Sequence, residues 1–393
     1  MYRICITTIV TLVLFVALSC KNTSAKQSGS EMISIDSLLQ NRYEKLLEYP
    51  VNSLSIPRSY NPITKEIKVV ESKDWTSGFY PGNLWQLYKL TGKEAFKNKA
   101  VEWTAFIEKE KYNGGTHDMG FKIYSSFGEG FEITKNEHYK DVIVESANTL
   151  ITRFDENVGS LRSWDFNADI WEFPVIIDNM MNLELLFEAT RISGDSIYHN
   201  IAVKHANTTL KNHFREDNSS YHVVVYDTVS GGVKSKVTHQ GFNDNSAWAR
   251  GQAWGIYGFT MCYRYTQDPK YLEQAEQSAA FYLQHAKLPE DGIPYWDFDD
   301  PKIPNAVKDV SAATIVASAL VELSMYTNND AYLDYSNKVL NSLKSGVYII
   351  PIDVEAPFIL KHSTGNWPKN DEMDGPIVYG DFYFLELMLR IKE

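Results

Sequence analysis

The chain has 393 residues, of which 44% are hydrophobic and 22% are charged, and its formal net charge at pH 7 is −12. This composition excludes a disordered or low-complexity chain, because such chains have too few apolar residues to form a core. The negative net charge argues against unselective attraction to nucleic acid or to an anionic membrane surface, so we expect no nucleic-acid partner.

The first residues are typical of a secretion signal with a lipidation site. Arg3 precedes an apolar stretch over residues 4–18, and Cys20 follows shortly after it. We therefore predict that residues 1–19 are a lipoprotein signal peptide, that Cys20 carries lipid and that residues 20–34 are a flexible tether. The mature protein would be anchored in a bacterial cell envelope, facing the periplasm or the outer surface, and would meet a membrane only through this lipid. A transmembrane anchor is the alternative, although the apolar stretch is short for a spanning helix.

From residue 35 onward, apolar residues recur at helical spacing, and no linker-like segment divides the chain. Segments that are apolar on nearly all sides, over residues 245–266 and 309–327, belong inside a protein, whereas those with a charged face, over 95–110 and 269–284, belong outside. We therefore predict an all-α fold over residues 35–393, arranged as a barrel of alternating inner and outer helices in one domain. A two-domain helical protein is the alternative.

Strand-like alternation is sparse. Residues 221–226 alternate and run into a Ser-Gly-Gly turn, which predicts a short β-hairpin inserted among the helices.

Two aspartates occupy unusual positions. Asp118 lies in a glycine-rich loop over residues 114–120, and Asp178 lies between a pair of isoleucines and a pair of methionines over residues 176–181. The ends of inner barrel helices face a central bowl, so both carboxyl groups are candidates for a site. Either aspartate could instead cap a helix or interact with its dipole, a role worth about 1 kcal/mol.

A third polar segment, over residues 239–255, leads into a very apolar helix. Arg250 and Trp254 are four residues apart there and therefore share one helical face. An arginine flanked by tryptophan on an inner helix is either a buried ion-pair partner, with Asp244 close in sequence, or a fork for a substrate carboxylate.

Other features set limits on the chemistry. Trp75 and Trp164 lie in predicted loops, where packing alone explains them less well than a sugar-stacking role. The sequence contains no His-Glu-x-x-His, Cys-x-x-Cys or P-loop motif, so we expect neither a metal nor a cofactor.

Five segments together resemble the unsaturated glucuronyl hydrolases of glycoside hydrolase family 88. They occur in the same order over nearly all of the chain after the tether, and they are specific in combination rather than singly. The resemblance implies an α6/α6 barrel and removal of the 4,5-unsaturated uronic acid that polysaccharide lyases leave at the non-reducing end of oligosaccharides. The segments are residues 75–79, 117–121, 177–182, 240–254 and 379–386.

The resemblance also implies functional residues. It assigns the two catalytic acids to Asp118 and Asp178. His222 is the least secure of the implied substrate contacts, because an exposed strand histidine is the alternative there. The implied substrate contacts are Trp75, His117, Trp164, His222, Gln240, Arg250 and Trp254.

The chemistry distinguishes the two acids. An unsaturated uronide is a vinyl ether, so protonation at C4 leaves a cation at C5 to which water adds, and the resulting hemiketal opens and releases the next sugar. The acid must hold a proton near neutral pH, which an apolar environment favours. We therefore predict Asp178 as the general acid and base, with Asp118 orienting the ring hydroxyls or supporting Asp178. Arg250 or Gln240 would bind the uronate carboxylate.

The substrate class follows with less detail. We expect an oligosaccharide derived from a glycosaminoglycan, and Ser363 and Lys369, in a loop over residues 361–370, could contact a sulfate on the leaving sugar. A merely solvated loop is the alternative. Other functions left open are an unsaturated rhamnogalacturonyl hydrolase acting on pectin fragments and a glycan-binding surface lipoprotein, which would not need two carboxyl groups.

Overall fold

The computed structural model describes Met1 and residues 34–392. The chain from Ile35 onward forms one compact unit. The predicted signal peptide over residues 1–19, the tether and the lipidated Cys20 lie outside the described residues.

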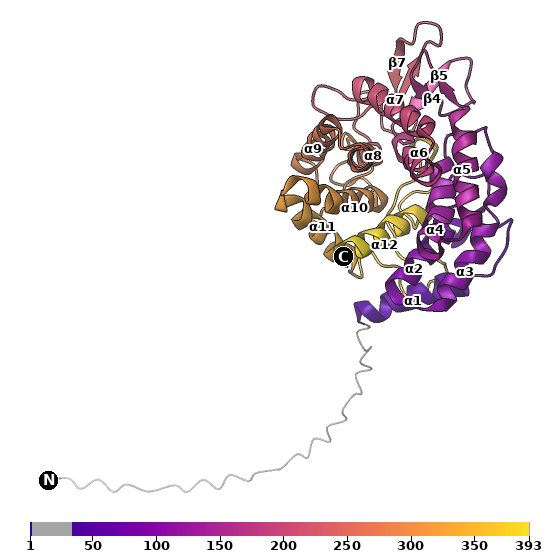
Figure 1. Ribbon diagram of the computed structural model, residues 1–393. Coiled ribbons are helices and arrows are strands. Elements are labelled where there is room, and N and C mark those ends of the chain that lie inside the picture. Colours follow the sequence, from indigo (N-terminus) through magenta and orange to yellow (C-terminus); the bar gives the residue numbers. More distant parts are fainter. Residues whose placement is uncertain (2–33, 393) are drawn as a thin grey trace. The chain divides into compact units, whose positions relative to one another are not determined.

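The compact unit is a double ring of helices (Figure 1). Each inner helix contacts the next around a closed ring, and each outer helix packs against an inner one. The inner ring consists of α2 (Phe79–Thr91), the π-helix η2 (Gly120–Gly128) with α4 (Glu129–Thr134), α6 (Asn179–Ser193), α8 (Ala249–Thr266), α10 (Val310–Thr327) and α12 (Val378–Lys392). The outer ring consists of α1 (Ile35–Glu48), α3 (Glu94–Ala105), α5 (Glu137–Ile151), α7 (Ser196–Asn212), α9 (Pro269–Gln284) and α11 (Asp330–Leu343).

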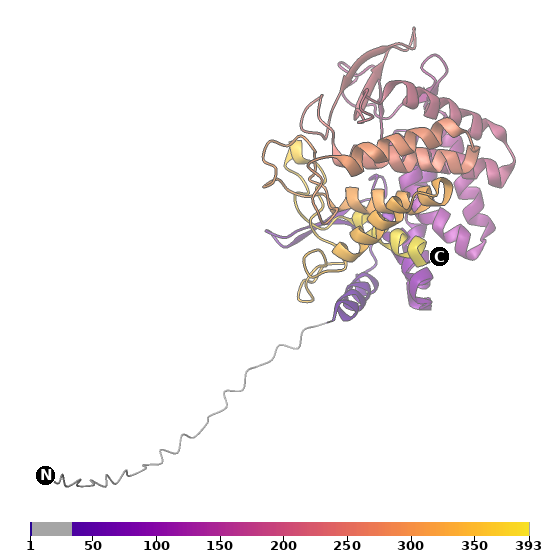
Figure 2. The ribbon, with the colours of Figure 1, turned by 90° about the vertical axis from the view of Figure 1, so that its left-hand side faces the viewer.

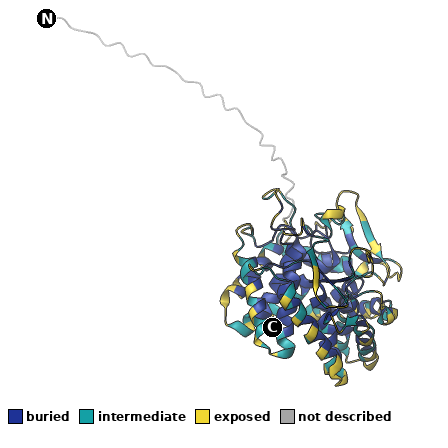
Figure 3. Cartoon of the chain, turned by 90° about the horizontal axis from the view of Figure 1, so that it is seen from above, coloured by how far each residue is buried: buried dark blue, intermediate teal, exposed yellow. Residues whose placement is uncertain are grey.

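This arrangement confirms the predicted α6/α6 barrel. Helices α8 and α10 are buried on nearly all sides, whereas α9 buries one face only, as their patterns of apolar residues predict. Exposed residues accordingly lie at the periphery of the unit in Figure 3, around a buried interior. Helix α10 is long and apolar enough to cross a membrane, but 78% of its apolar window is buried inside the barrel, which explains its composition.

Two predicted boundaries differ from the structure. Helix α8 begins at Ala249 rather than near residue 245, because residues 240–248 form a loop that donates to Asp297 from the Phe242 backbone N–H and the Ser246 hydroxyl. Helix α3 ends at Ala105, and a separate 3₁₀ helix, η1 (Glu108–Tyr112), follows it.

The short strands lie outside the two rings. The predicted hairpin exists, and a third strand joins it antiparallel to make the sheet order β5-β6-β7. The β1–β2 hairpin ahead of α2 was not predicted. The strands are β1 (Ile56–Asn61), β2 (Glu66–Val70), β3 (Phe154–Asp155), β4 (Ser160–Leu161), β5 (Phe173–Ile176), β6 (Val223–Tyr226) and β7 (Val233–Val237).

The two ends of the inner ring differ in their surroundings. Long connections from the orange and yellow parts of the chain gather at one end of the barrel, and the C-terminus lies at the other (Figure 2). We call these the N-terminal and C-terminal ends of the inner ring, after the ends of the inner helices found there. A short 3₁₀ helix, η3 (Trp367–Lys369), belongs to the connections at the N-terminal end.

Candidate active site

A cavity of about 260 Å³ lies at the N-terminal end of the inner ring. The segments that precede the inner helices supply most of its lining, so the barrel brings together residues that are far apart in the sequence. Both candidate acids line it. The predicted site residues in its lining are Trp75, His117, Asp118, Trp164, Asp178, Gln240 and Lys369.

Asp178 is held in an environment that favours its protonated form. It precedes the first residue of α6, yet its carboxyl group makes no capping hydrogen bond, so the capping alternative does not hold for it. The residue is 8% exposed and its Oδ2 atom has no hydrogen-bond partner. Burial raises the pKa of Asp178 to about 7, the charge of Arg250 opposes this rise, and the charge of Asp118 adds to it.

Asp118 is fixed by its own loop. The Thr116 hydroxyl donates to Asp118 Oδ2 at 2.7 Å, and His117 Nε2 lies 3.2 Å from Oδ1. The π-helix η2 begins two residues later at Gly120, where an added Cβ would lie 2.7 Å from Cα of Asn182 on α6. Glycine therefore permits the close approach of η2 to α6 that brings Asp118 and Asp178 to one cavity.

His222 lies next to Asp178 rather than on the surface. Its Nδ1 accepts the backbone N–H groups of His239 and Gln240, both at 3.1 Å. The proton of the neutral ring is therefore on Nε2, which lies 3.7 Å from Asp178 Oδ2. Burial lowers the pKa of His222 well below its usual value, so the ring stays neutral. The alternative of an exposed strand histidine is wrong, although His222 does not itself line the cavity.

Arg250 forms a buried ion pair, which is one of its two predicted roles. Its Nη1 donates to Asp309 Oδ2 at 2.7 Å and to the carbonyl of Thr364, and its Nη2 donates to the carbonyl of Gly365. The side chain is fully buried and does not line the cavity. The predicted ion pair of Arg250 therefore exists, with Asp309 rather than Asp244 as its partner. Its role as a fork for a substrate carboxylate stays a prediction.

Two further predicted contacts lie outside the cavity lining. Trp254 is buried one turn after Arg250 on α8, and its indole N–H acts on Asp178 by lowering the pKa of the carboxyl group. Ser363 is 1% exposed, its backbone pairs with Gly375, and it is not among the residues that line the cavity, so its contact with a sulfate stays a prediction.

The cavity lining also contains residues that the sequence did not single out. Arg58 comes from strand β1, where no motif surrounds it. Phe166 is 47% exposed and stacks on Trp164 with ring centroids 4.8 Å apart. His239 begins the polar segment over residues 239–255, and Tyr379 lies in a segment that carried the family resemblance, so the segments gave a signal that the individual residues did not.

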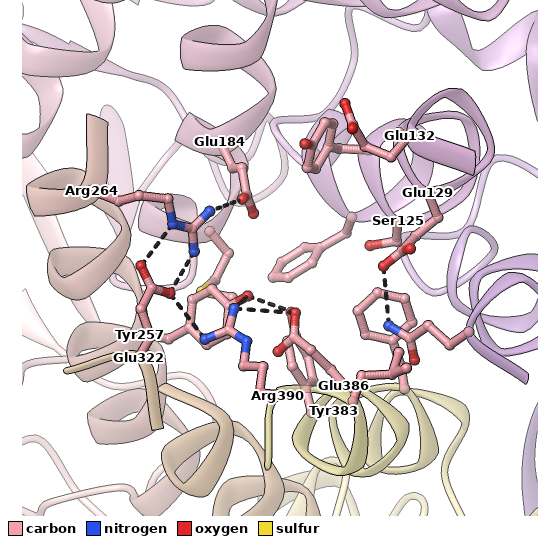
Figure 4. A pocket seen from close by; sticks show the side chains of 18 of the residues that line it. Ser125, Glu129, Glu132, Glu184, Tyr257, Arg264, Glu322, Tyr383, Glu386 and Arg390 are labelled. Carbon is pink, nitrogen blue, oxygen red and sulfur yellow. Dashed lines mark hydrogen bonds and ion pairs between the residues drawn. The ribbon is translucent and has the colours of Figure 1, made fainter. Parts of the chain in front are cut away.

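A second cavity, of about 390 Å³, lies at the C-terminal end of the inner ring. Three of its carboxylates are paired with arginines, as Figure 4 shows: Arg264 contacts Glu184 and Glu322, and Arg390 contacts Glu322 and Glu386. None of the predicted site residues lines it. In the described part of the chain, no three His, Cys, Asp or Glu side chains are grouped as metal ligands.

Comparison with known proteins connects this geometry to an enzyme family. The sequence model of Glycosyl Hydrolase Family 88 matches residues 55–345. The chain is 60% identical to an unsaturated glucuronyl hydrolase of Formosa agariphila, over 96% of this chain and 95% of that protein. It is similar to the crystal structure of an unsaturated glucuronyl hydrolase specific for heparin, with a TM-score of 0.87 and 41% identity over 91% of this chain and 96% of the other. It is also similar to a mutant unsaturated glucuronyl hydrolase of Streptococcus agalactiae complexed with dGlcA-GalNAc6S, with a TM-score of 0.76 and 25% identity over 93% and 94% of the two chains.

Proposed function

Because the chain belongs to glycoside hydrolase family 88, we propose a residue-level mechanism for the reaction that it catalyses. The enzyme removes the 4,5-unsaturated uronic acid from the non-reducing end of oligosaccharides that lyases produce. The remaining question is which side chains of this chain act on the double bond, on the ring and on the leaving sugar.

Asp178 acts as the general acid and base. Its protonated carboxyl group gives its proton to C4 of the vinyl ether, and positive charge develops at C5. A water molecule then adds to C5 and returns a proton to the Asp178 carboxylate, after which the hemiketal opens and releases the leaving sugar. The observation that carries this assignment is a carboxyl group that lines the cavity, lacks a cationic partner in contact and has a pKa of about 7.

The neighbours of Asp178 support this cycle. The His222 Nε2–H group faces Asp178 Oδ2 and stabilises the carboxylate that remains after proton transfer. Asp118 is held by the Thr116 hydroxyl and lies beside His117, so it is suited to hold ring hydroxyl groups and the attacking water. Its negative charge also helps to keep Asp178 protonated before the reaction.

Aromatic and polar side chains bind the sugars. Trp75, Trp164 and Phe166 line the cavity with aromatic rings, which suits stacking on the apolar faces of sugar rings. The Gln240 amide donates to the carbonyl of Gly365 at 3.1 Å, which leaves its carbonyl oxygen available to a substrate hydroxyl.

The substrate's anionic groups require a cation. Two cationic side chains line the cavity: Arg58 is paired with Glu372 and Asp74, whereas Lys369 forms no ion pair with the described residues. Lys369 therefore binds an anionic group of the substrate, such as a sulfate on the leaving sugar. The heparin-specific relative and the complex with dGlcA-GalNAc6S support a glycosaminoglycan source, and no observation favours pectin fragments.

Replacement of Asp178 tests the mechanism. Asp178→Asn removes the transferable proton and keeps the shape of the side chain, so we expect a folded protein whose kcat is lower by about 10²–10⁴-fold. The assay follows the loss of the conjugated-alkene absorbance of lyase-generated disaccharides from heparin, chondroitin and pectin. A variant with near-normal turnover would rule out Asp178 as the acid, and preferred turnover of the pectin fragment would rule out the glycosaminoglycan source.

The cell-envelope location is a separate proposal that the sequence alone supports. If Cys20 is lipidated, the full-length protein will partition into detergent with the membrane fraction, and Cys20→Ser will release it into the soluble fraction with unchanged activity. Equal partitioning of the two proteins would contradict a lipid anchor.

A further inference from the structure

One wall of the active-site cavity is a loop with an unusual backbone. This wall loop, residues 362–375, contributes Gly365, Asn366, Lys369 and Asp371 to the cavity lining. Four of its residues other than glycine adopt positive φ angles. Such conformations are unfavourable for residues with a side chain and persist only where surrounding contacts hold them. The four residues are His362 (67°), Asn370 (51°), Glu372 (56°) and Asp374 (50°).

Arg58 supplies the most complete of these contacts. Its Nε and Nη2 atoms donate to the two carboxylate oxygens of Glu372, both at 2.7 Å, and its Nη1 donates to Asp74 Oδ2 at 2.8 Å. Ser59 Oγ donates to the same Glu372 carboxylate at 2.7 Å, and the Glu372 side chain is 2% exposed. Burial would raise the pKa of Glu372, but the charge and hydrogen bonds of Arg58 keep it below the usual value, so the pair stays ionised.

The other partner of Arg58 is Asp74, which precedes a second lining residue, Trp75. Asp74 Oδ1 accepts the backbone N–H of Thr76 at 2.9 Å and its hydroxyl at 2.6 Å, which fixes the turn that presents Trp75 to the cavity. The Arg58 guanidinium lies 5.8 Å from the centre of the Trp75 ring. One side chain thus connects the Trp75 turn with the wall loop.

Glu372 packs against Gly365, which lines the cavity. A Cβ atom at Gly365 would lie 2.7 Å from both Cβ and Oε2 of Glu372, so the two residues are in tight contact. The carbonyl of Gly365 in turn accepts hydrogen bonds from Gln240 and Arg250. A displaced Glu372 would therefore displace the surface against which the substrate lies.

We propose that Arg58 is a positioning residue that fixes the shape of the substrate cavity by holding Glu372 and Asp74 together. It does not bind the substrate's carboxylate itself, because two protein carboxylates already use its guanidinium. The inference rests on the proposed function, since the ligand whose binding it shapes is the unsaturated oligosaccharide. The residue acts on binding, and the proton transfer at Asp178 stays intact.

Kinetics of Arg58 variants test this role. Arg58→Gln should raise KM for an unsaturated disaccharide by at least about tenfold while kcat changes less than about threefold, because substrate binding is lost without loss of the chemical step. Arg58→Lys keeps the charge but not the bidentate contact, so its KM should lie between those of wild type and Arg58→Gln. The KM of the double variant Arg58→Gln/Glu372→Gln should not exceed the higher of the two single-variant KM values, because the two side chains act as one unit.

A matched control separates positioning from general loss of stability. Arg264 is also bidentate to one glutamate and bonded to a second acid, but at the C-terminal end of the inner ring. Arg264→Gln should lower the melting temperature and leave KM unchanged. A folded Arg58→Gln protein with wild-type KM would overturn the proposal, as would an equal rise of KM in Arg264→Gln. If Arg58→Gln does not fold, Arg58→Lys decides by the same criterion. A wild-type enzyme that consumes no unsaturated disaccharide would instead contradict the proposed function.

Discussion

Asp178 at the N-terminal end of the inner ring and Glu322 at the C-terminal end are buried to the same degree, with 8% and 7% of their surfaces exposed. Burial raises the pKa of Asp178 to about 7, with no cation in contact. Burial also acts to raise the pKa of Glu322, but Arg264 and Arg390 lower it to about 2. The comparison shows that the partner decides what a buried carboxyl group does in this barrel: the paired group stabilises the fold, and the unpaired group can exchange a proton.

Helix polarity contributes to this division. Arg264 and Arg390 lie in the last turns of α8 and α12, where the negative ends of the helix dipoles favour cations. The arginines there also satisfy the carboxylates of the neighbouring helices. At the other end, the helices begin from loops, and the loops can present a carboxyl group without such a partner.

The largest expected effect comes from removing an arginine from the ion pairs at the C-terminal end of the inner ring. Arg264→Gln leaves Glu184 and Glu322 buried without their shared cation, and removal of one partner of a buried ion pair costs about 3–5 kcal/mol. Chemical denaturation should report this loss of unfolding free energy, while kcat stays within about twofold because catalysis uses the other end. A stable variant, or one whose kcat falls in proportion to its stability, would contradict the separation of the two ends.

A second effect should have the opposite sign at Asp178, whose carboxyl group has no cation in contact. The folded-state pKa of Asp178 lies above its ordinary value of 3.8, so between about pH 4 and pH 7 the folded protein holds a proton that the unfolded chain has lost. Its contribution to stability therefore falls as pH rises through that window. Asp178→Asn removes this cost, and we expect the variant to be more stable than wild type by roughly 1–3 kcal/mol at pH 8, with little difference at pH 4. Thermal unfolding at both pH values measures it, and a variant less stable at pH 8 would contradict the raised pKa.

The sequence predicted the features that leave a local pattern, and it did not predict pairs of residues that are distant in the chain. The ring architecture follows from apolar periodicity, and it placed α8 and α10 inside the barrel correctly because burial on all sides leaves a strong pattern. The environment of Asp178 was also visible, because its apolar neighbours adjoin it in the chain. In contrast, the pairing of Arg250 with Asp309 joins residues that are 59 positions apart, and no local pattern indicates it.

Long-range contacts also explain what the sequence left out. Arg58 and Glu372 are 314 positions apart, and each is an ordinary charged residue in its own segment. Phe166 resembles any loop aromatic until its stacking on Trp164 is seen. Sequence periodicity predicts which face of a helix is buried, but not which loop side chains meet at the end of a barrel.

The pH dependence of catalysis gives the smallest and most specific test of the comparison. The general acid must be protonated in the free enzyme, so kcat/KM should fall about tenfold for each pH unit above the pKa of Asp178, near pH 7. The charge of Asp118 helps to raise this pKa, so its removal should lower the pKa of Asp178. In Asp118→Asn, the fall of the remaining kcat/KM with rising pH should therefore begin at a lower pH than in wild type. Glu386→Gln removes a carboxylate that contacts Arg390 at the C-terminal end of the inner ring, and it should not change the pH at which kcat/KM begins to fall. An equal shift of this pH in both variants would mean that overall charge, rather than the nearby charge of Asp118, sets the proton affinity of Asp178.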